Sequence, residues 1–154
     1  MIFILCLGII GFSVMGGIYF AFSAFVMKSF DELEKSEGMR AMQSINDVIL
    51  KSFFMVLFFG TTLIAIVLII YALTHLNDSN AIFLLASGLT YFVGMFLCTV
   101  LFNVPLNNEL KAADGNSKDG QKIWDEYLVV WTRWNHVRTL SCVIAATFLF
   151  LIAL

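Results

Sequence analysis

Residues 53–76 read FFMVLFFGTTLIAIVLIIYALTHL, with no Asp, Glu, Lys or Arg among them. Further apolar stretches lie at about 1–27, 81–104 and 137–154. A helix needs about 20 apolar residues to cross the hydrocarbon core of a bilayer, and it satisfies its own backbone amides within the segment. The sequence therefore predicts an all-α membrane protein built as a bundle of four transmembrane helices.

The composition favours the same class. The mean hydropathy is +0.92, 60% of the residues are hydrophobic and 13% are charged. A soluble domain of 154 residues cannot bury so much apolar surface in one core. The first stretch lacks a basic n-region and is longer than the apolar part of a signal peptide, so we expect it to be retained. No basic arm or nucleic-acid motif is present, so we expect membrane lipids, and no nucleic acid, as partners.

The basic residues predict an orientation. All nine Lys and Arg fall within 28–51 and 111–138, which are alternate connections and therefore lie on the same side of the membrane. The positive-inside rule makes that side cytoplasmic. We expect both termini and the 75–80 turn on the non-cytoplasmic side of a bacterial-type inner or plasma membrane.

We expect one domain over residues 1–154, with helices extended on the cytoplasmic side. Apolar residues recur at helical spacing in 30–50 and in 121–138, and each pattern continues into the next apolar stretch. The third helix reaches Pro105, which lacks an amide and clashes with the carbonyl of Leu101, so the helix should kink or end there. The expected helices cover about 2–28, 40–76, 80–112 and 121–154.

The two halves of the chain also resemble each other. Val26–Leu33 is similar to Val104–Leu110, and Met42–Val48 aligns with Trp131–Val137. Two parallel helical hairpins would form such an internal repeat, and ligand sites often lie where repeats meet. Chance similarity between apolar segments is the alternative.

Polar and aromatic residues gather near the cytoplasmic helix ends. Amides carry donors and acceptors together, so an inward-facing set can hold a ketone, a phenol or a quinone by its oxygen atoms. Polar residues inside a membrane are costly and therefore indicate function. The alternative is that they cap helix ends and bind the carbonyls that Pro105 frees. The candidates are Gln43, Asn46, Asn103, Asn107, Tyr127, Trp131, Trp134, Asn135, His136 and Arg138.

His136 and Arg138 are the chemically sharpest pair. Histidine accepts a proton near neutral pH, and arginine keeps its charge and can stabilise an enolate or phenolate. The alternatives are a solvated histidine and an arginine that anchors the helix at the membrane interface. His75 lies at the opposite end of the predicted bundle, the carboxylates near His136 do not cluster, and no phosphate loop or dinucleotide fingerprint occurs. We therefore expect no metal and no nucleotide cofactor.

Four motifs carry a resemblance to a known family. They are Phe22–Met27, Met42–Asn46, Asn103–Asn107 and Trp131–Thr139, and they occur in the expected order over most of the chain. Together they resemble the anthrone oxygenase-like family of integral membrane proteins. The resemblance implies a four-helix fold. It also implies, as in some fungal relatives, oxidation of anthrones to anthraquinones by O2 without a cofactor.

The resemblance thus implies a membrane-embedded, cofactor-independent oxygenase-like protein. Its substrates would be O2 and a hydrophobic aromatic molecule, either a ketone of the anthrone type or a quinol. We expect His136 to act as the base, Arg138 to neutralise the enolate and Asn135 to donate to its oxygen. The expected substrate-binding residues are Gln43, Asn46, Asn103, Asn107, Tyr127, Trp131 and Trp134.

The competing interpretation is a protein without catalysis. The same pocket could bind a lipid, a quinone or a hydrophobic metabolite, or the protein could be the partner of another membrane protein. The glycine-rich first helix is compatible with a homo-oligomer and equally with tight internal packing.

Overall fold

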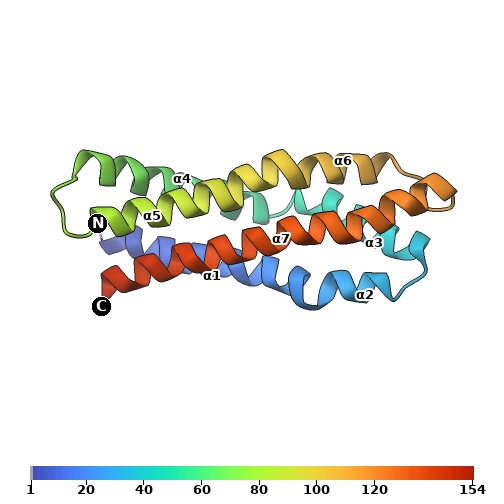
Figure 1. Cartoon of the computed structure of the whole chain (residues 1–154), viewed down its shortest axis with the longest axis horizontal. Coiled ribbons are helices and arrows are strands. Elements are labelled where there is room, and N and C mark those ends of the chain that lie inside the picture. Colours follow the sequence, from blue (N-terminus) through green and yellow to red (C-terminus); the bar gives the residue numbers. More distant parts are fainter. Residues whose placement is uncertain (1) are drawn as a thin grey trace.

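A computed structural model describes residues 2–154, and four of its helices are long and apolar enough to cross a membrane (Figure 1). This confirms the all-α bundle of four transmembrane helices. Both termini and the turn between the second and third of these helices lie at one end of the bundle (Figure 1). The four helices are Ile2–Asp31, Phe54–Thr74, Ala81–Ala112 and Lys118–Ala153.

Two of the four membrane-spanning helices contain π-helical segments. The first consists of α1 (Ile2–Ala21), η1 (Phe22–Val26) and α2 (Met27–Asp31). The third consists of α5 (Ala81–Tyr91), η2 (Phe92–Leu97), η3 (Thr99–Asn103) and α6 (Val104–Ala112). The other helices are α3 (Lys35–Ile49), α4 (Phe54–Thr74) and α7 (Lys118–Ala153).

The expected helix over 40–76 is instead two helices, α3 and α4, which are joined by a turn at 50–53. Ser52 sits in this turn, where its Oγ donates to the carbonyl of Ile49 (2.8 Å) and accepts from the amide of Phe54 (3.2 Å). A serine side chain that bonds to nearby backbone groups competes with the helix ladder. The break separates the amphipathic α3 from the membrane-spanning α4.

The helix that contains Pro105 does not end there, because α6 continues to Ala112. The two π-helical segments η2 and η3 stand directly before the proline. In membrane helices, local π-helical turns and Ser or Thr side chains re-satisfy the carbonyls that a proline frees. Within this π-helical stretch, Thr99 Oγ1 donates to the carbonyl of Met95 at 2.7 Å.

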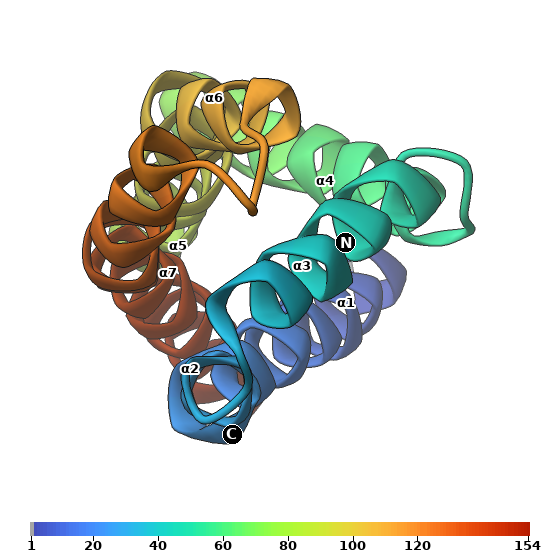
Figure 2. The ribbon, with the colours of Figure 1, turned by 90° about the vertical axis from the view of Figure 1, so that its right-hand side faces the viewer.

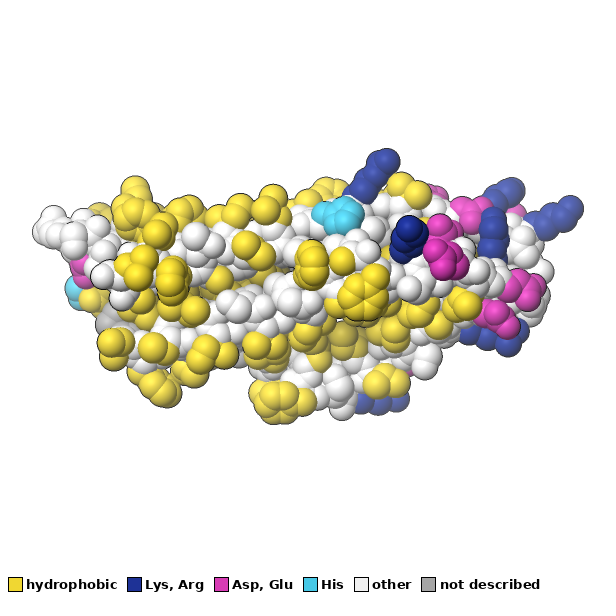
Figure 3. All heavy atoms as spheres, turned by 90° about the horizontal axis from the view of Figure 1, so that it is seen from below, with side chains coloured by type: hydrophobic (Ala, Val, Ile, Leu, Met, Phe, Trp, Pro, Cys, Tyr) yellow, Lys and Arg dark blue, Asp and Glu magenta, His cyan; other side chains and the backbone are white. Residues whose placement is uncertain are grey.

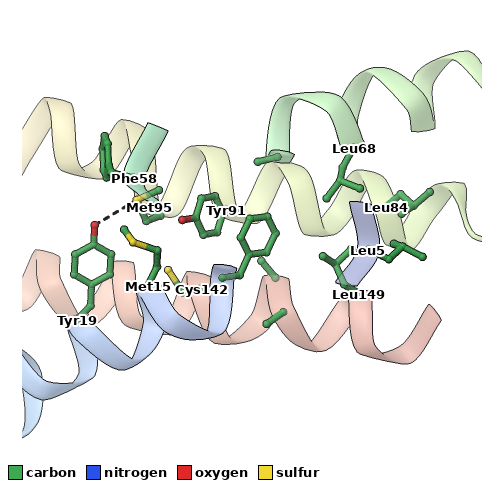
Figure 4. Close-up of a cluster of buried hydrophobic side chains, with 14 of the residues drawn as sticks. Leu5, Met15, Tyr19, Phe58, Leu68, Leu84, Tyr91, Met95, Cys142 and Leu149 are labelled. Carbon is green, nitrogen blue, oxygen red and sulfur yellow. Dashed lines mark hydrogen bonds between the residues drawn. The ribbon is translucent and has the colours of Figure 1, made fainter. Parts of the chain in front are cut away.

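The core lies along the shared seam of α1, α4, α5 and α7, which surround a common axis (Figure 2). Phe12 and Tyr91 stack there with ring centroids 3.9 Å apart, and the Tyr91 hydroxyl donates to Thr61 Oγ1 at 2.6 Å. Figure 4 shows this cluster, in which Tyr19 donates to the Met95 sulfur at 3.5 Å. Membrane helices associate through such close packing and through hydrogen bonds between helices.

The surface divides by polarity. Hydrophobic side chains cover most of the length of the molecule, and most of the charged side chains visible on this face gather towards one end (Figure 3). At that end, Lys35 pairs with Asp125 (2.6 Å) and Lys111 pairs with Asp47 (2.7 Å). The hydrogen bond from Lys111 lowers the pKa of the Asp47 carboxyl. All four side chains are exposed, so these pairs position α3 more than they stabilise the fold.

Candidate functional site

A cavity of about 260 Å³ lies between the first membrane-spanning helix, α3, α4, the Ala81–Ala112 helix and α7. Most of its lining is aliphatic or aromatic, and the lining residues include no His, Asp or Glu. Such a mostly apolar cavity with a few polar groups is typical of small-molecule sites. The polar groups and the tyrosine and tryptophan on its wall are Tyr19, Asn46, Thr99, Asn107, Trp131 and Arg138.

Arg138 is the charged residue of this cavity, and only 5% of its surface is exposed. Its guanidinium carbon lies 4.4 Å from the centre of the Tyr19 ring and 4.9 Å from that of Trp131. Its Nη2 donates to Asn135 Oδ1 at 2.8 Å, whereas its buried Nε has no partner. Within residues 2–154 no carboxylate pairs with it. A buried charge held by neutral groups alone has unused capacity to bind an anion.

Asn135 is fully buried and positions Arg138 from behind. Its Nδ2 donates to the Tyr19 carbonyl and to Ser23 Oγ, both at 2.7 Å, while its Oδ1 accepts from Arg138. The amide therefore ties α7 to the first helix at the start of its π-helical segment. Asn135 does not line the cavity. It therefore holds Arg138 in place and does not contact a ligand in the cavity.

A second polar group on the wall joins three helices. The Tyr127 hydroxyl donates to Asn107 Oδ1 at 2.7 Å, and Asn46 Nδ2 lies 3.5 Å from the same hydroxyl. Asn46 and Asn107 line the cavity. The Tyr127 ring stacks between Trp124 and Trp131, with centroids 5.9 and 5.7 Å away. Of these three rings only Trp131 lines the cavity, so Tyr127, an expected substrate-binding residue, lies behind the wall.

Trp131 belongs to both groups, because it lines the cavity and its indole lies beside Arg138. Its buried Nε1 has no acceptor. Behind it, Asn103 Nδ2 donates to the Trp131 carbonyl at 3.3 Å. Asn103 is buried outside the cavity, so it joins the Ala81–Ala112 helix to α7.

Besides Asn103, Tyr127 and Asn135, three further expected site residues lie outside the cavity. Gln43 donates to the carbonyls of Leu110 and Ala113 (2.8 and 3.2 Å), so it caps the end of α6. Trp134 stacks on Phe102 with centroids 3.7 Å apart and does not line the cavity. His136 is exposed in a separate shallow groove beside Thr139 and Leu140.

Helical spacing explains which α7 residues meet. Trp131 follows Tyr127 by four residues and Arg138 follows Trp131 by seven, so all three side chains lie on the buried face of α7. His136 directly follows the buried Asn135, so its side chain points away from that face. The sequence-based hypothesis did not include Tyr19 or Thr99, although both line the cavity. For Tyr19, the signal available in the sequence was a tyrosine within a glycine-rich apolar helix.

The family comparison covers most of this site. A family model described as anthrone oxygenase matches residues 53–148, more than half of the chain. The chain belongs to the anthrone oxygenase family. The matched region includes Asn107, Trp131 and Arg138, while Tyr19 and Asn46 lie before it. Comparisons with curated proteins and with solved structures gave no match.

Histidine, cysteine and carboxylate side chains are scattered. Over the described residues 2–154, no three of them come together as ligands for a metal ion. The cavity instead offers amide, indole and guanidinium groups together with an aromatic wall. Chemically, this set can hold an oxygen that carries negative charge and a flat apolar body beside it.

Proposed function

We propose that this protein is a membrane-embedded oxygenase that binds an aromatic ketone of the anthrone type, or a related quinol, in the cavity beside Arg138. The observation that carries the proposal is the buried guanidinium of Arg138, unpaired with any carboxylate among residues 2–154, on the wall of an apolar cavity. Membership of the anthrone oxygenase family supports an oxygenase-like role.

The chemistry needs a stabilised enolate. A methylene beside a ketone loses a proton, and the charge moves onto the ketone oxygen next to Arg138. One preorganised donor to such an oxygen is worth about 10²–10³-fold in rate. The aromatic wall formed by Tyr19 and Trp131 would hold the rings.

The enolate then reacts with O2 without help from another oxidant. It transfers one electron to O2, and the carbon radical joins the superoxide to form a peroxide, which takes up a proton. Cleavage of the O–O bond with loss of the remaining C–H proton leaves a ketone and releases water. The balance is one CH2 and one O2 converted to one C=O and one H2O.

His136 receives no step in this proposal, because it lies in a separate groove and not in the cavity. The proton is transferred instead to water or hydroxide, and no side chain of the cavity is assigned as its acceptor. Asn135 acts as a positioning residue, since its Oδ1 holds Arg138.

The test is oxygen uptake with dithranol, a hydroxylated anthrone, by purified protein in lipid nanodiscs. We expect uptake above the autoxidation rate of protein-free nanodiscs, and incorporation of one oxygen atom from ¹⁸O2. Arg138→Gln should lower kcat/KM about 10²–10³-fold. Arg133→Gln is the matched control, because Arg133 is exposed on the same helix. Equal rates for wild type, Arg138→Gln and empty nanodiscs would exclude the proposal.

One observation favours the non-catalytic candidate. The cavity lining holds no histidine or carboxylate that could accept a proton near neutral pH. A site that only binds an aromatic ligand, such as a quinone, needs no such group. Saturable binding of dithranol without oxygen uptake would support this second function.

A further inference from the structure

The cavity reaches the outer surface of the bundle through apolar side chains. Four of its lining residues are exposed, and all four are hydrocarbon or aromatic: Leu50 (63%), Phe59 (57%), Val100 (44%) and Val104 (40%). They belong to the α3–α4 turn, α4, η3 and α6. A mouth with such a rim faces lipid more favourably than water.

The inner wall of the cavity has the opposite character. Arg138 Nε and Trp131 Nε1 are buried donors without acceptors, and both residues line the cavity. A buried donor left unsatisfied costs about 1–3 kcal/mol, and more when it is charged. Among residues 2–154 no side chain supplies the anion that Arg138 lacks. An occupant of the cavity can supply this acceptor.

We propose that the cavity takes a lipophilic acid from the bilayer and binds it in ionised form. The anionic oxygen lies at Arg138 and Trp131, and the hydrocarbon or aromatic body extends towards Leu50, Phe59, Val100 and Val104. The ligand class is a phenol, an enol or a carboxylic acid that partitions into membranes. This inference uses the cavity of the proposed function but does not depend on turnover.

The first test uses the sign of a pKa shift in the ligand. A lipophilic nitrophenol changes colour on ionisation, so its pKa can be read while it is bound to protein in nanodiscs. An apolar cavity without a usable cation would raise the phenol pKa, whereas Arg138 should lower it. We expect the bound phenol to titrate at least about one pKa unit below its value in empty nanodiscs, a tenfold preference for the anion.

Two variants assign this shift. Arg138→Gln should abolish or reverse it, and Arg133→Gln should leave it unchanged because Arg133 is exposed. If Arg138→Gln does not fold, the direction of the phenol pKa shift in the wild-type protein still tests the inference. A raised pKa, no saturable binding, or a lowered pKa that persists in Arg138→Gln would overturn the inference.

Displacement of the phenol defines the acid further. An anthracene carboxylate and a long-chain fatty acid are compared with their methyl esters. Displacement by either acid but not by its ester supports the inference and distinguishes an aromatic from an aliphatic ligand. Displacement by the esters at the same concentrations as by the acids would overturn it.

The second test examines the mouth. Val100→Trp should slow phenol binding or weaken it at least about tenfold by filling the rim. Val93→Trp is the matched control, because Val93 is an equally apolar, exposed residue of the same helix that does not line the cavity. Unchanged binding in Val100→Trp would overturn entry from the lipid. All of these readouts measure binding, so they can succeed or fail independently of oxygen uptake.

Discussion

At the residue scale, Asn135 is the side chain whose hydrogen bonds connect the most groups around Arg138. Its amide serves three groups at once, since it donates to the Tyr19 carbonyl and to Ser23 and accepts from Arg138. Two of these bonds join the first helix to α7, and the third lies within α7. Its bond to Arg138 helps to hold the guanidinium over Tyr19 and Trp131.

Asn135→Ala should therefore destabilise the protein by about 1–3 kcal/mol, because it leaves three polar groups without this partner. The measurement is thermal unfolding in detergent, followed by tryptophan fluorescence. Asn108→Ala is the control, since Asn108 is exposed on α6. If both variants unfold at the wild-type temperature, Asn135 does not have the bracing role that its hydrogen bonds indicate.

At the element scale, glycine decides how closely the Ala81–Ala112 helix approaches α4. A Cβ on Gly88 would lie 2.8 Å from the Ala65 carbonyl oxygen and 2.7 Å from an Ile69 side-chain carbon. A backbone oxygen cannot move aside as a side chain can. On α4 itself, a Cβ on Gly60 would meet no atom within 4 Å.

Gly88→Ala should cost about 1–3 kcal/mol of stability, since the two helices must separate to admit the methyl group. Gly60→Ala should be neutral or slightly stabilising, because alanine favours helices over glycine. The comparison is made on the unfolding temperature and on the yield of monodisperse protein. A Gly88→Ala variant as stable as Gly60→Ala would contradict the close packing of these helices.

At the scale of the whole molecule, most of the charged side chains gather towards the end opposite the termini (Figures 1 and 3). The positive-inside rule predicts that this end is cytoplasmic. The 75–80 turn belongs to the end with the termini, and the loop around Asn116 to the charged end.

Single cysteines at Ser79 and Asn116, both exposed, test this orientation. They are placed in a variant that lacks Cys6, Cys98 and Cys142. An impermeant maleimide should label Ser79→Cys in intact bacterial cells, and Asn116→Cys only after the membrane is permeabilised. The reverse labelling pattern would show the opposite topology.

Much of the fold and part of the site could be predicted from local patterns. The four apolar stretches predict the four helices, and the spacing of Tyr127, Trp131 and Arg138 places them on one buried face. The break at Ser52 and the π-helical segments before Pro105 could not be predicted, because they depend on single hydrogen bonds. The rotation of α7 against its neighbours decides that His136 points outward and that Asn135 bonds to the first helix and holds Arg138.

The amino-acid sequence alone determined that this protein is a membrane bundle with its charges mainly at one end. Those properties follow from the apolar length and charge of each segment, whatever its neighbours are. Tertiary structure alone decided that Tyr19 meets Arg138 and that the cavity opens between apolar residues. Lipid is as apolar as the helices, so hydrophobicity does not fix their rotation; close packing and a few buried hydrogen bonds do.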